Sequence, residues 1–317
     1  MIPRTDFTVA YNYQERPEYT RNMITAQYGY SWNSTSKKWG FQIYPARVNI
    51  VKMSNQSPTF NEMIQNPFVK DSYIDHFDVG GVYHASFYSD PSLNPKHTNY
   101  KATFRLDIAG NLLSAFNKLM PVDSTGSRTV WNSPYAQYVR AEGSYTHTWK
   151  FGKRERMAVA ARFLAGGGFA YGNSNALPFE QLFWSGGSNS MRGWQARSLG
   201  PGITPMDSTL TIPNQTGDMK LEANLEFRFP LFSIFYGALF FDAGNVWIKR
   251  EITDLKSFTN GIALNTGLGI RLDIQFVVVR FDWGLKLREP AEQKWYGPKD
   301  WFKKGGNTFQ FGIGYPF

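Results

Sequence analysis

The 317-residue sequence contains no cysteine, only four histidines and no long apolar run. Without cysteine, the chain can form neither a disulfide framework nor a thiolate metal site. The histidines, at positions 76, 84, 97 and 147, lack the spacing of metal ligands. The longest nearly uncharged apolar stretch, residues 229–241, is shorter than the roughly 20 residues that a membrane-spanning helix needs. We therefore expect no metal, no other cofactor and no helical membrane domain.

The sequence also lacks a block of basic residues and the common catalytic motifs. Its formal net charge is +9, but lysine and arginine are dispersed, so we expect no nucleic-acid partner. Residues 186–190, Gly-Gly-Ser-Asn-Ser, do not have the spacing of a nucleophile elbow. The three glycines at 166–168 precede no helix, so they indicate a bend at a strand end and not a phosphate loop. Nothing in the sequence predicts an enzyme.

What the sequence does contain is a period-two alternation of apolar and polar residues from end to end. In residues 100–108, Tyr, Ala, Phe, Leu and Ile alternate with Lys, Thr, Arg and Asp. Because side chains on a strand point alternately to opposite faces, this pattern predicts an amphipathic β-strand. About twelve such strands are predicted, at 7–14, 24–33, 39–51, 76–88, 100–108, 138–149, 157–170, 219–229, 235–247, 261–274, 277–287 and 307–317. Short helices are predicted in two loops, at 59–64 and 111–119.

The two faces of these strands favour a membrane barrel over a soluble β-sandwich or a lipocalin-like barrel. The strands exceed the roughly 5–6 residues usual in soluble sheets. Their apolar faces are rich in aromatic residues near the strand ends, as in the girdles of outer-membrane barrels. The polar faces carry opposite charges that suit a wet lumen. The expected pairs are Arg140 with Glu142, Arg271 with Asp273, Arg280 with Asp282, and Glu222 and Glu226 with Arg228.

The connections between the predicted strands alternate between long and short. Those near 52–75, 109–134, 171–218, 248–260 and 288–306 are long, and those near 33–38, 89–98, 150–156, 230–234 and 275–276 are short. Outer-membrane barrels have long external loops and short periplasmic turns. The fold class that we expect is therefore all-β, a transmembrane antiparallel β-barrel of about twelve strands with both termini in the periplasm.

The alternation also assigns a face to each side chain. The residues expected to face lipid include Leu225, Phe227, Leu264, Leu268, Phe281 and Phe311. Those expected to face the lumen include Glu226, Asn265, Arg271, Arg280 and Gln310.

The C-terminal segment continues this alternation to the last residue. Its expected apolar face consists of Phe309, Phe311, Ile313, Tyr315 and Phe317. A terminal amphipathic strand that ends in Phe resembles the sorting signal that the assembly machinery reads on outer-membrane barrels. The plainer alternative is that these residues are only the last strand.

The connection at 171–218 contains the most specific motif. A loop of this length without secondary structure is usually functional. Its centre reads Met191-Arg192-Gly193-Trp194, preceded by Gly-Gly-Ser-Asn. This segment resembles the sixth external loop of the BamA/TamA superfamily of outer-membrane assembly factors, the bacterial surface antigen family. The hallmark of that loop is a hydrophobic residue, Arg-Gly and an aromatic residue.

The resemblance implies that the loop folds inward, plugs the lumen and places Arg192 between acidic side chains of the inner wall. Glu226, within Asn-Leu-Glu-Phe, and Asp242, within Phe-Asp-Ala-Gly-Asn-Val-Trp, look like the family's acids. Two carboxylates would give a guanidinium strong, directional hydrogen bonds. The alternative is a disordered loop with a solvated arginine.

The resemblance is strong over residues 166–317 and weaker at 13–19. Members of this superfamily carry periplasmic POTRA repeats and sixteen-stranded barrels. Residues 1–317 therefore resemble a single barrel domain of a short form without POTRA repeats, or the C-terminal part of a sixteen-stranded barrel. The resemblance implies a protein of the bacterial outer membrane that inserts or translocates proteins, with client outer-membrane proteins, membrane lipid and lipopolysaccharide as partners. The alternatives are a reduced relative with a passive, structural or homo-oligomeric role, and a porin-like channel.

Overall fold

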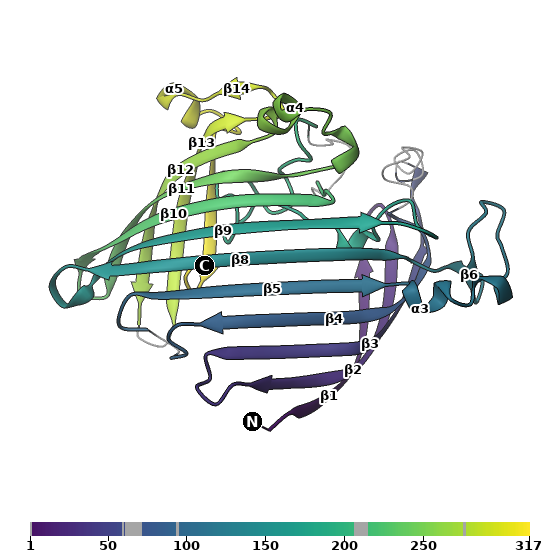
Figure 1. The fold of residues 1–317 in the computed structure, drawn as a ribbon. Coiled ribbons are helices and arrows are strands. Elements are labelled where there is room, and N and C mark those ends of the chain that lie inside the picture. Colours follow the sequence, from purple (N-terminus) through teal and green to yellow (C-terminus); the bar gives the residue numbers. More distant parts are fainter. Residues whose placement is uncertain (1, 59, 61–71, 93–94, 206–214, 275–276) are drawn as a thin grey trace.

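The computed structural model describes residues 2–58, 60, 72–92, 95–205, 215–274 and 277–317, which form one large antiparallel sheet. The sheet has thirteen strands, and their order follows the chain from purple to yellow in Figure 1. Its long strands are β1 (Arg4–Glu15), β2 (Thr20–Asn33), β3 (Trp39–Ser54), β4 (His76–Tyr88), β5 (Asn99–Ala109), β8 (Tyr138–Phe151), β9 (Met157–Ala170), β10 (Met219–Phe232), β11 (Phe235–Trp247), β12 (Ala263–Asp273), β13 (Val278–Glu289) and β15 (Asn307–Ile313). The predicted all-β, antiparallel fold is confirmed, since each predicted strand corresponds to one of these.

The remaining elements are short and lie in the connections. They are β6 (Thr129–Val130), β7 (Ser133–Pro134), β14 (Lys294–Trp295), α3 (Asn111–Ser114), α4 (Leu255–Asn260), α5 (Pro298–Trp301) and the single 3-10 turns η1 (Asn117–Leu119), η2 (Lys153–Glu155), η3 (Phe179–Gln181) and η4 (Lys249–Glu251). The helix predicted at 111–119 corresponds to α3 and η1. The helix predicted at 59–64 lies, except for Phe60, outside the described residues. In the part of the chain that the structure describes, no helix is long and apolar enough to cross a membrane.

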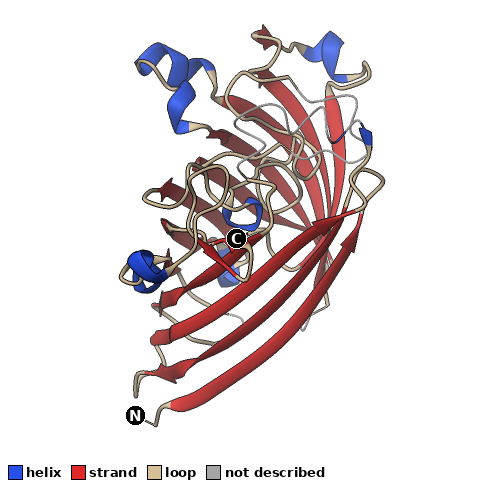
Figure 2. Ribbon diagram, turned by 90° about the vertical axis from the view of Figure 1, so that its right-hand side faces the viewer, coloured by secondary structure: helices blue, strands red, loops and turns tan. Residues whose placement is uncertain are grey.

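The sheet curves strongly (Figure 2), and the described residues of the connection at 171–218 lie on its concave side. Strand β1 pairs only with β2, and β15 pairs only with β13. Among the described residues, therefore, no ladder joins the first strand to the last, and each has one free edge.

The convex face of the sheet is apolar and the concave face is polar. Leu225, Leu268, Phe281 and Phe311 are between 47% and 59% exposed, and Phe227 and Leu264 are half-buried. Glu226, Asn265, Arg271 and Arg280 are completely buried on the other face, where Gln310 is half-buried. This arrangement is the inverse of a soluble barrel and matches a wall that faces lipid outside and a polar lumen inside.

A charge placed on the convex face should therefore destabilise the protein. We expect Leu268→Arg to cost about 2–4 kcal/mol, the cost of arginine near the bilayer midplane. The matched control is Leu255→Arg in α4, where the leucine is 78% exposed outside the strands and the change should stay within about 0.5 kcal/mol. Urea unfolding of both variants in liposomes measures the difference. Equal stability of the two variants would mean that the faces are inverted.

A bulge in β3 brings both even-numbered and odd-numbered residues to the concave face. The pairing register shifts between Tyr44 and Arg47, around Pro45, which has no N–H to contribute to a ladder. As a result, Gln42 and Tyr44 lie on the same concave face as Arg47, although an unbroken strand would place them opposite.

The C-terminal strand is shorter than predicted. Strand β15 ends at Ile313, and Gly314 adopts a φ of 82°, a left-handed conformation that glycine accommodates. After this turn, the Tyr315 ring lies 4.1 Å from the Arg228 guanidinium, on the polar side of the sheet. The prediction of one continuous apolar face to Phe317 was wrong. Phe309, Phe311 and Ile313 are 58–73% exposed on the convex face, whereas Phe317 lies 5.2–5.9 Å from three inner arginines.

The three glycines at 166–168 lie inside β9 and do not form the predicted bend. A Cβ atom on Gly166 would come within 2.6 Å of the Phe183 ring, and one on Gly168 within 2.3 Å of the Leu177 side chain. Both neighbours belong to the connection at 171–218. These glycines therefore make room for the long loop to lie directly against the strand.

Candidate functional site

The connection at 171–218 is called the long loop below. Its described residues, 171–205 and 215–218, lie against the concave face of the sheet and contact both halves of it. Its first anchor is Glu180 in η3, which accepts a hydrogen bond from His76 Nε2 in β4 at 2.7 Å. Arg21 in β2 lies 3.9 Å from the same carboxylate. Burial alone would raise the pKa of Glu180, but the adjacent His76 and Arg21 hold it below its ordinary value. The carboxylate therefore stays charged and ties the loop to the N-terminal strands.

The next contacts join the loop to the middle strands. The Arg140 guanidinium of β8 stacks 4.1 Å from the Phe183 ring and donates to the Gln181 carbonyl at 3.0 Å. It also binds Glu142 at 2.7 Å, the pairing expected from the sequence. An arginine held by a carboxylate and an aromatic face has little freedom, so this part of the loop has a defined position.

Two serines of the loop bind Glu222 in β10. Ser185 Oγ donates to the Glu222 carboxylate at 2.7 Å, and Ser190 Oγ donates to the same oxygen. The backbone carbonyl of Ser190 accepts from Asn224 Nδ2 at 3.0 Å, and Arg162 of β9 binds the second oxygen of Glu222 at 3.1 Å. The residues before the motif are therefore fixed to two adjacent strands.

Arg192 is completely buried between the two carboxylates that the resemblance implied. Its Nε and Nη2 atoms donate to the two oxygens of Asp242 at 3.0 and 2.8 Å, and its backbone N–H donates at 3.2 Å. Nη1 donates to Glu226, and the guanidinium lies 3.6 Å from the Phe240 ring centre. This arrangement satisfies the guanidinium on both edges and on one face.

The two carboxylates are themselves held in place. Asp242 accepts further hydrogen bonds from Asn224 and Asn265, both at 2.9 Å. Glu226 binds Arg228 at 2.7 Å and Arg271 at 3.0 Å. Residues of the wall therefore hold both carboxylates independently of the loop arginine, so that the wall forms a preorganised receptor for it.

The ion pairs of the inner wall depart in two respects from the expected pairing. Glu222 binds Arg162 and Lys220 in place of the expected Arg228, which binds Glu226. Arg271 binds Glu226 and, at 2.6 Å, Asp282, in place of the expected Asp273. The expected pairing was wrong because the buried Arg271 side chain extends along the inner wall to Asp282 on the adjacent strand β13 and to Glu226 on β10. Arg280 binds Asp282 at 3.0 Å as expected, and it also donates to the Ser188 carbonyl at 2.6 Å.

Gly193 is required by close packing between the loop and the wall. A Cβ atom on Gly193 would lie 2.7 Å from the Asn265 side chain. On the other side, a Cβ atom on Gly284 of β13 would lie 2.2 Å from the Arg192 carbonyl oxygen. The carbonyl of Gly193 accepts from Thr308 Oγ1 of β15 at 2.9 Å. Glycine at both positions lets the motif lie directly on the backbone of the wall.

Trp194 and Met191 form the apolar part of the site. Both are buried and pack with Leu199 and Ala263 in one cluster. Trp194 Nε1 donates to Glu289 at 2.8 Å. The Trp194 carbonyl accepts from Gln310 Nε2 of β15 at 2.8 Å, so the motif reaches the last strand of the sheet.

A second buried cluster, in the N-terminal half, was missed by the sequence reasoning. Arg47 donates to Asp107 at 2.7 Å and to the Tyr138 hydroxyl at 2.8 Å, and it lies 3.4 Å from Asp78. The Tyr138 hydroxyl and Asn49 Nδ2 also donate to Asp78, at 2.8 and 3.0 Å. Both aspartates are completely buried. The strand alternation placed these residues on the polar face, but no local signal connects four different strands.

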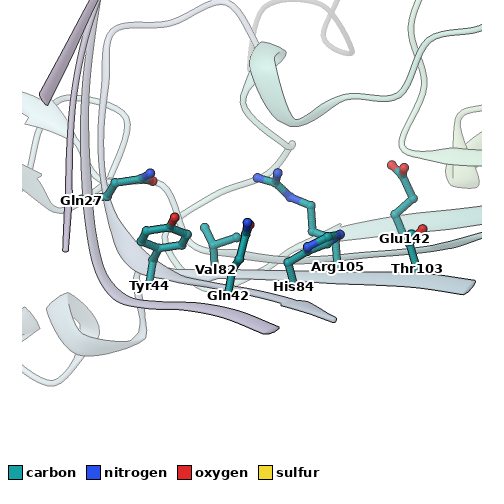
Figure 3. A pocket seen from close by; sticks show the side chains of 8 residues that line it. All are labelled: Gln27, Gln42, Tyr44, Val82, His84, Thr103, Arg105 and Glu142. Carbon is teal, nitrogen blue, oxygen red and sulfur yellow. The ribbon is translucent and has the colours of Figure 1, made fainter. Parts of the chain in front are cut away.

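Beside this cluster, a polar cavity of about 330 Å³ opens on the concave face (Figure 3). Its side chains all project from the sheet toward the same side, and come from β2, β3, β4, β5 and β8. They are Gln27, Gln42, Tyr44, Val82, His84, Thr103, Arg105 and Glu142. Within the described residues, no three histidine, aspartate or glutamate side chains gather as metal ligands.

Comparison with known proteins identifies relatives of this architecture. Residues 4–317 match the family model described as the Omp85 superfamily domain. The chain is 28% identical over 134 residues to outer membrane protein assembly factor BamA of Neisseria meningitidis serogroup B, a match that covers 39% of this chain and 16% of that protein.

Solved structures resemble the fold over nearly the whole chain. BamA from Haemophilus ducreyi lacking POTRA domains 1–3 aligns with a TM-score of 0.66 at 13% identity, covering 98% of this chain and 58% of that one. CdiB from Acinetobacter baumannii aligns with a TM-score of 0.51 at 14% identity, covering 93% and 42%. The chain therefore spans 58% or less of each of these three proteins.

Proposed function

Because the chain belongs to the Omp85 superfamily and is a β-barrel protein of the bacterial outer membrane, we propose that it inserts or translocates other proteins at that membrane. In this proposal, residues 1–317 act as a single transmembrane domain whose long loop plugs the lumen. The clients are unfolded outer-membrane proteins, and the membrane partners are outer-membrane lipid and lipopolysaccharide. The similarity to a protein named outer membrane protein assembly factor BamA supports this class of function.

The observation that carries the proposal is the pair of free strand edges at β1 and β15. In lipid, each unpaired backbone group costs several kcal/mol, so a free edge favours pairing with another strand. A client strand can add to such an edge by backbone hydrogen bonds that do not depend on its side chains. Free edges therefore suit a protein that receives many different β-strands.

The long loop has a supporting role in this proposal. Arg192, Gly193 and Trp194 together contact β10, β11, β12, β13 and β15. The arginine lock, made of Met191, Arg192, Gly193, Trp194, Glu226 and Asp242, holds these strands in one curvature and leaves the β15 edge at a defined position. The residues Phe309, Phe311, Ile313, Tyr315 and Phe317 serve as the sorting signal of the chain itself, while it is still unfolded.

The experiment combines a folding assay with crosslinking. Liposomes that contain the purified protein should fold an added, urea-unfolded outer-membrane barrel at least several-fold faster than empty liposomes. A photo-crosslinking residue at Phe7 in β1 or Phe311 in β15 should capture the client. The matched control is Phe163, which is 52% exposed on β9 between two paired neighbours and should capture little.

Two outcomes would contradict insertion. Unaccelerated folding together with a stable homodimer crosslinked through β1 would favour the passive, oligomeric role. A large and steady conductance in planar bilayers would favour the porin-like role, for which the polar cavity beside β2–β8 is the supporting observation. The proposed plug predicts small conductance that rises when residues 180–200 are deleted.

A further inference from the structure

The connection between β13 and β15 contains a segment, rich in lysine and aromatic residues, that has no role in the proposed function. This segment, residues 294–304, reads Lys-Trp-Tyr-Gly-Pro-Lys-Asp-Trp-Phe-Lys-Lys and is called the interface segment below. It includes β14 and α5 and holds four lysines, two tryptophans, one tyrosine and one phenylalanine, with a single acid.

The interface segment is fixed to the end of the barrel wall. Trp301 Nε1 donates to the Lys286 carbonyl at 2.7 Å, and the Tyr296 N–H donates to the Leu287 carbonyl at 2.8 Å. The connection also touches the α4 loop, because Gln293 Nε2 donates to the Asn260 carbonyl at 3.1 Å. The segment therefore lies at the same end of the barrel as the other long connections.

Its aromatic side chains extend the apolar convex face beyond the strand ends. Phe302 is 76% exposed, and its ring lies 6.0 Å from that of Trp283 in β13. Trp283 stacks in turn on Phe309, which is 73% exposed on the convex face. Trp295 is 67% exposed. Exposed aromatic rings at this position correspond to the girdle at the membrane–water interface.

The lysines carry charge that the segment does not neutralise. Lys303 lies 3.1 Å and Lys294 3.9 Å from Asp300. Lys299 and Lys304 are exposed and have no side-chain partner among the described residues. With four lysines and one aspartate, the segment has a net charge of +3 (4 − 1). Its charge is therefore complementary to an anionic layer beside the apolar wall.

We propose that the interface segment binds the phosphate groups of phosphorylated glycolipid in the outer leaflet, with its aromatic rings in the interfacial layer and Lys299 and Lys304 on phosphate. A soluble acidic partner would match the lysines but not the exposed rings that continue the lipid-facing wall. A zwitterionic lipid would match the rings but leave the charge of +3 uncompensated. The inference rests on the topology of the proposed function, in which the long connections are external.

The test measures lipid binding by the intact, folded protein with native mass spectrometry. The probes are bis-phosphorylated lipid A, lipid A of the same acyl chains without phosphate, and inorganic phosphate as a competitor. The wild type should prefer the phosphorylated lipid. Lys299→Gln/Lys304→Gln should weaken that binding roughly tenfold or more, since each basic residue near an anionic surface contributes on the order of a further severalfold.

The matched control is Lys118→Gln/Lys256→Gln, which removes two exposed lysines from other long connections and should change affinity less than twofold. Trp295→Ala/Phe302→Ala should weaken both lipids equally, because it removes the interfacial rings. Equal binding of the two lipids, wild-type affinity in the lysine variant, or complete competition by millimolar phosphate would each overturn the proposal.

Cysteine labelling separates this inference from the proposed function. Cysteines at Lys256 and Lys299 should react with an impermeant reagent on intact cells, and one at Lys153 in η2 should not. The reverse pattern would overturn the outer-leaflet assignment whatever the lipid data. If clients fold no faster but lipid binding and labelling give the expected results, the proposed insertion function is contradicted and the proposed lipid binding by the interface segment is supported.

Discussion

Arg192→Ala is expected to destabilise the folded protein by about 3–5 kcal/mol, the usual cost of removing one partner from a buried ion pair. In the structure, this guanidinium is completely buried and donates two hydrogen bonds to Asp242 and one to Glu226, and the backbone N–H of Arg192 donates a further one to Asp242. Without the guanidinium, Asp242 keeps only neutral donors, which are the side-chain amides of Asn224 and Asn265 and the backbone N–H of residue 192. A buried carboxylate without a cation is the main source of the penalty.

The measurement is urea unfolding in liposomes, together with proteolysis of the long loop. The variant should reduce the protection of the loop, because the segment around Gly193 then keeps only its single hydrogen bonds with Glu289, Thr308 and Gln310. Arg192→Lys should fall between wild type and alanine, since an ammonium keeps the charge but cannot contact both carboxylates with the same planar geometry.

A double variant separates the unpaired charge from the lost contact. Arg192→Met/Asp242→Asn should be more stable than Arg192→Met alone, because it no longer leaves a buried carboxylate unpaired. If Arg192→Ala unfolds at the same urea concentration as wild type with the loop still protected, the arginine is not a lock.

The strands and their faces could be predicted from the sequence because, along a membrane strand, apolar residues that face lipid alternate with polar residues that face the lumen. The run at 100–108 corresponds to β5, Asn99–Ala109, and its Phe104 is 50% exposed while Asp107 is completely buried. The rule failed only where the backbone departs from a regular strand. The bulge at Pro45 shifts the alternation in β3 by one residue, and Gly314 turns the chain before its end. Beyond these two residues, the alternation therefore no longer predicts which face a side chain lies on.

The candidate site could be predicted only in part, and for a different reason. Glu226 and Asp242 were assigned to Arg192 by resemblance, because no periodicity specifies which part of a wall a loop touches. The contacts of Glu222 with Ser185 and Ser190, and of Arg280 with Ser188, had no local signal. The glycines gave the best overlooked clue, since Gly166 and Gly284 sit where an added Cβ would collide with the loop.

The buried cluster around Arg47 should be as important to the N-terminal half as the lock is to the C-terminal half. Arg47→Met is expected to cost about 3–5 kcal/mol, because it leaves the completely buried Asp78 without its arginine partner and removes one of the three arginines around the buried Asp107. Tyr138 can still donate to Asp78, but a neutral hydroxyl compensates a buried carboxylate only partly.

Arg105→Met provides the control, since Arg105 binds the same Asp107 at 2.8 Å but its side chain is 47% exposed. A solvated pair contributes about 0–1 kcal/mol, so this variant should remain close to wild type in urea unfolding. The double variant Arg47→Met/Asp78→Asn should recover much of the loss by removing the unpaired charge of Asp78, while Asp107 keeps Arg105. Equal effects of Arg47→Met and Arg105→Met would contradict burial as the cause.

Because the two clusters share no residue, the losses in free energy of unfolding caused by Arg47→Met and Arg192→Ala should be additive within about 0.5 kcal/mol in the double variant. A larger coupling would mean that the long loop transmits strain from one half of the sheet to the other.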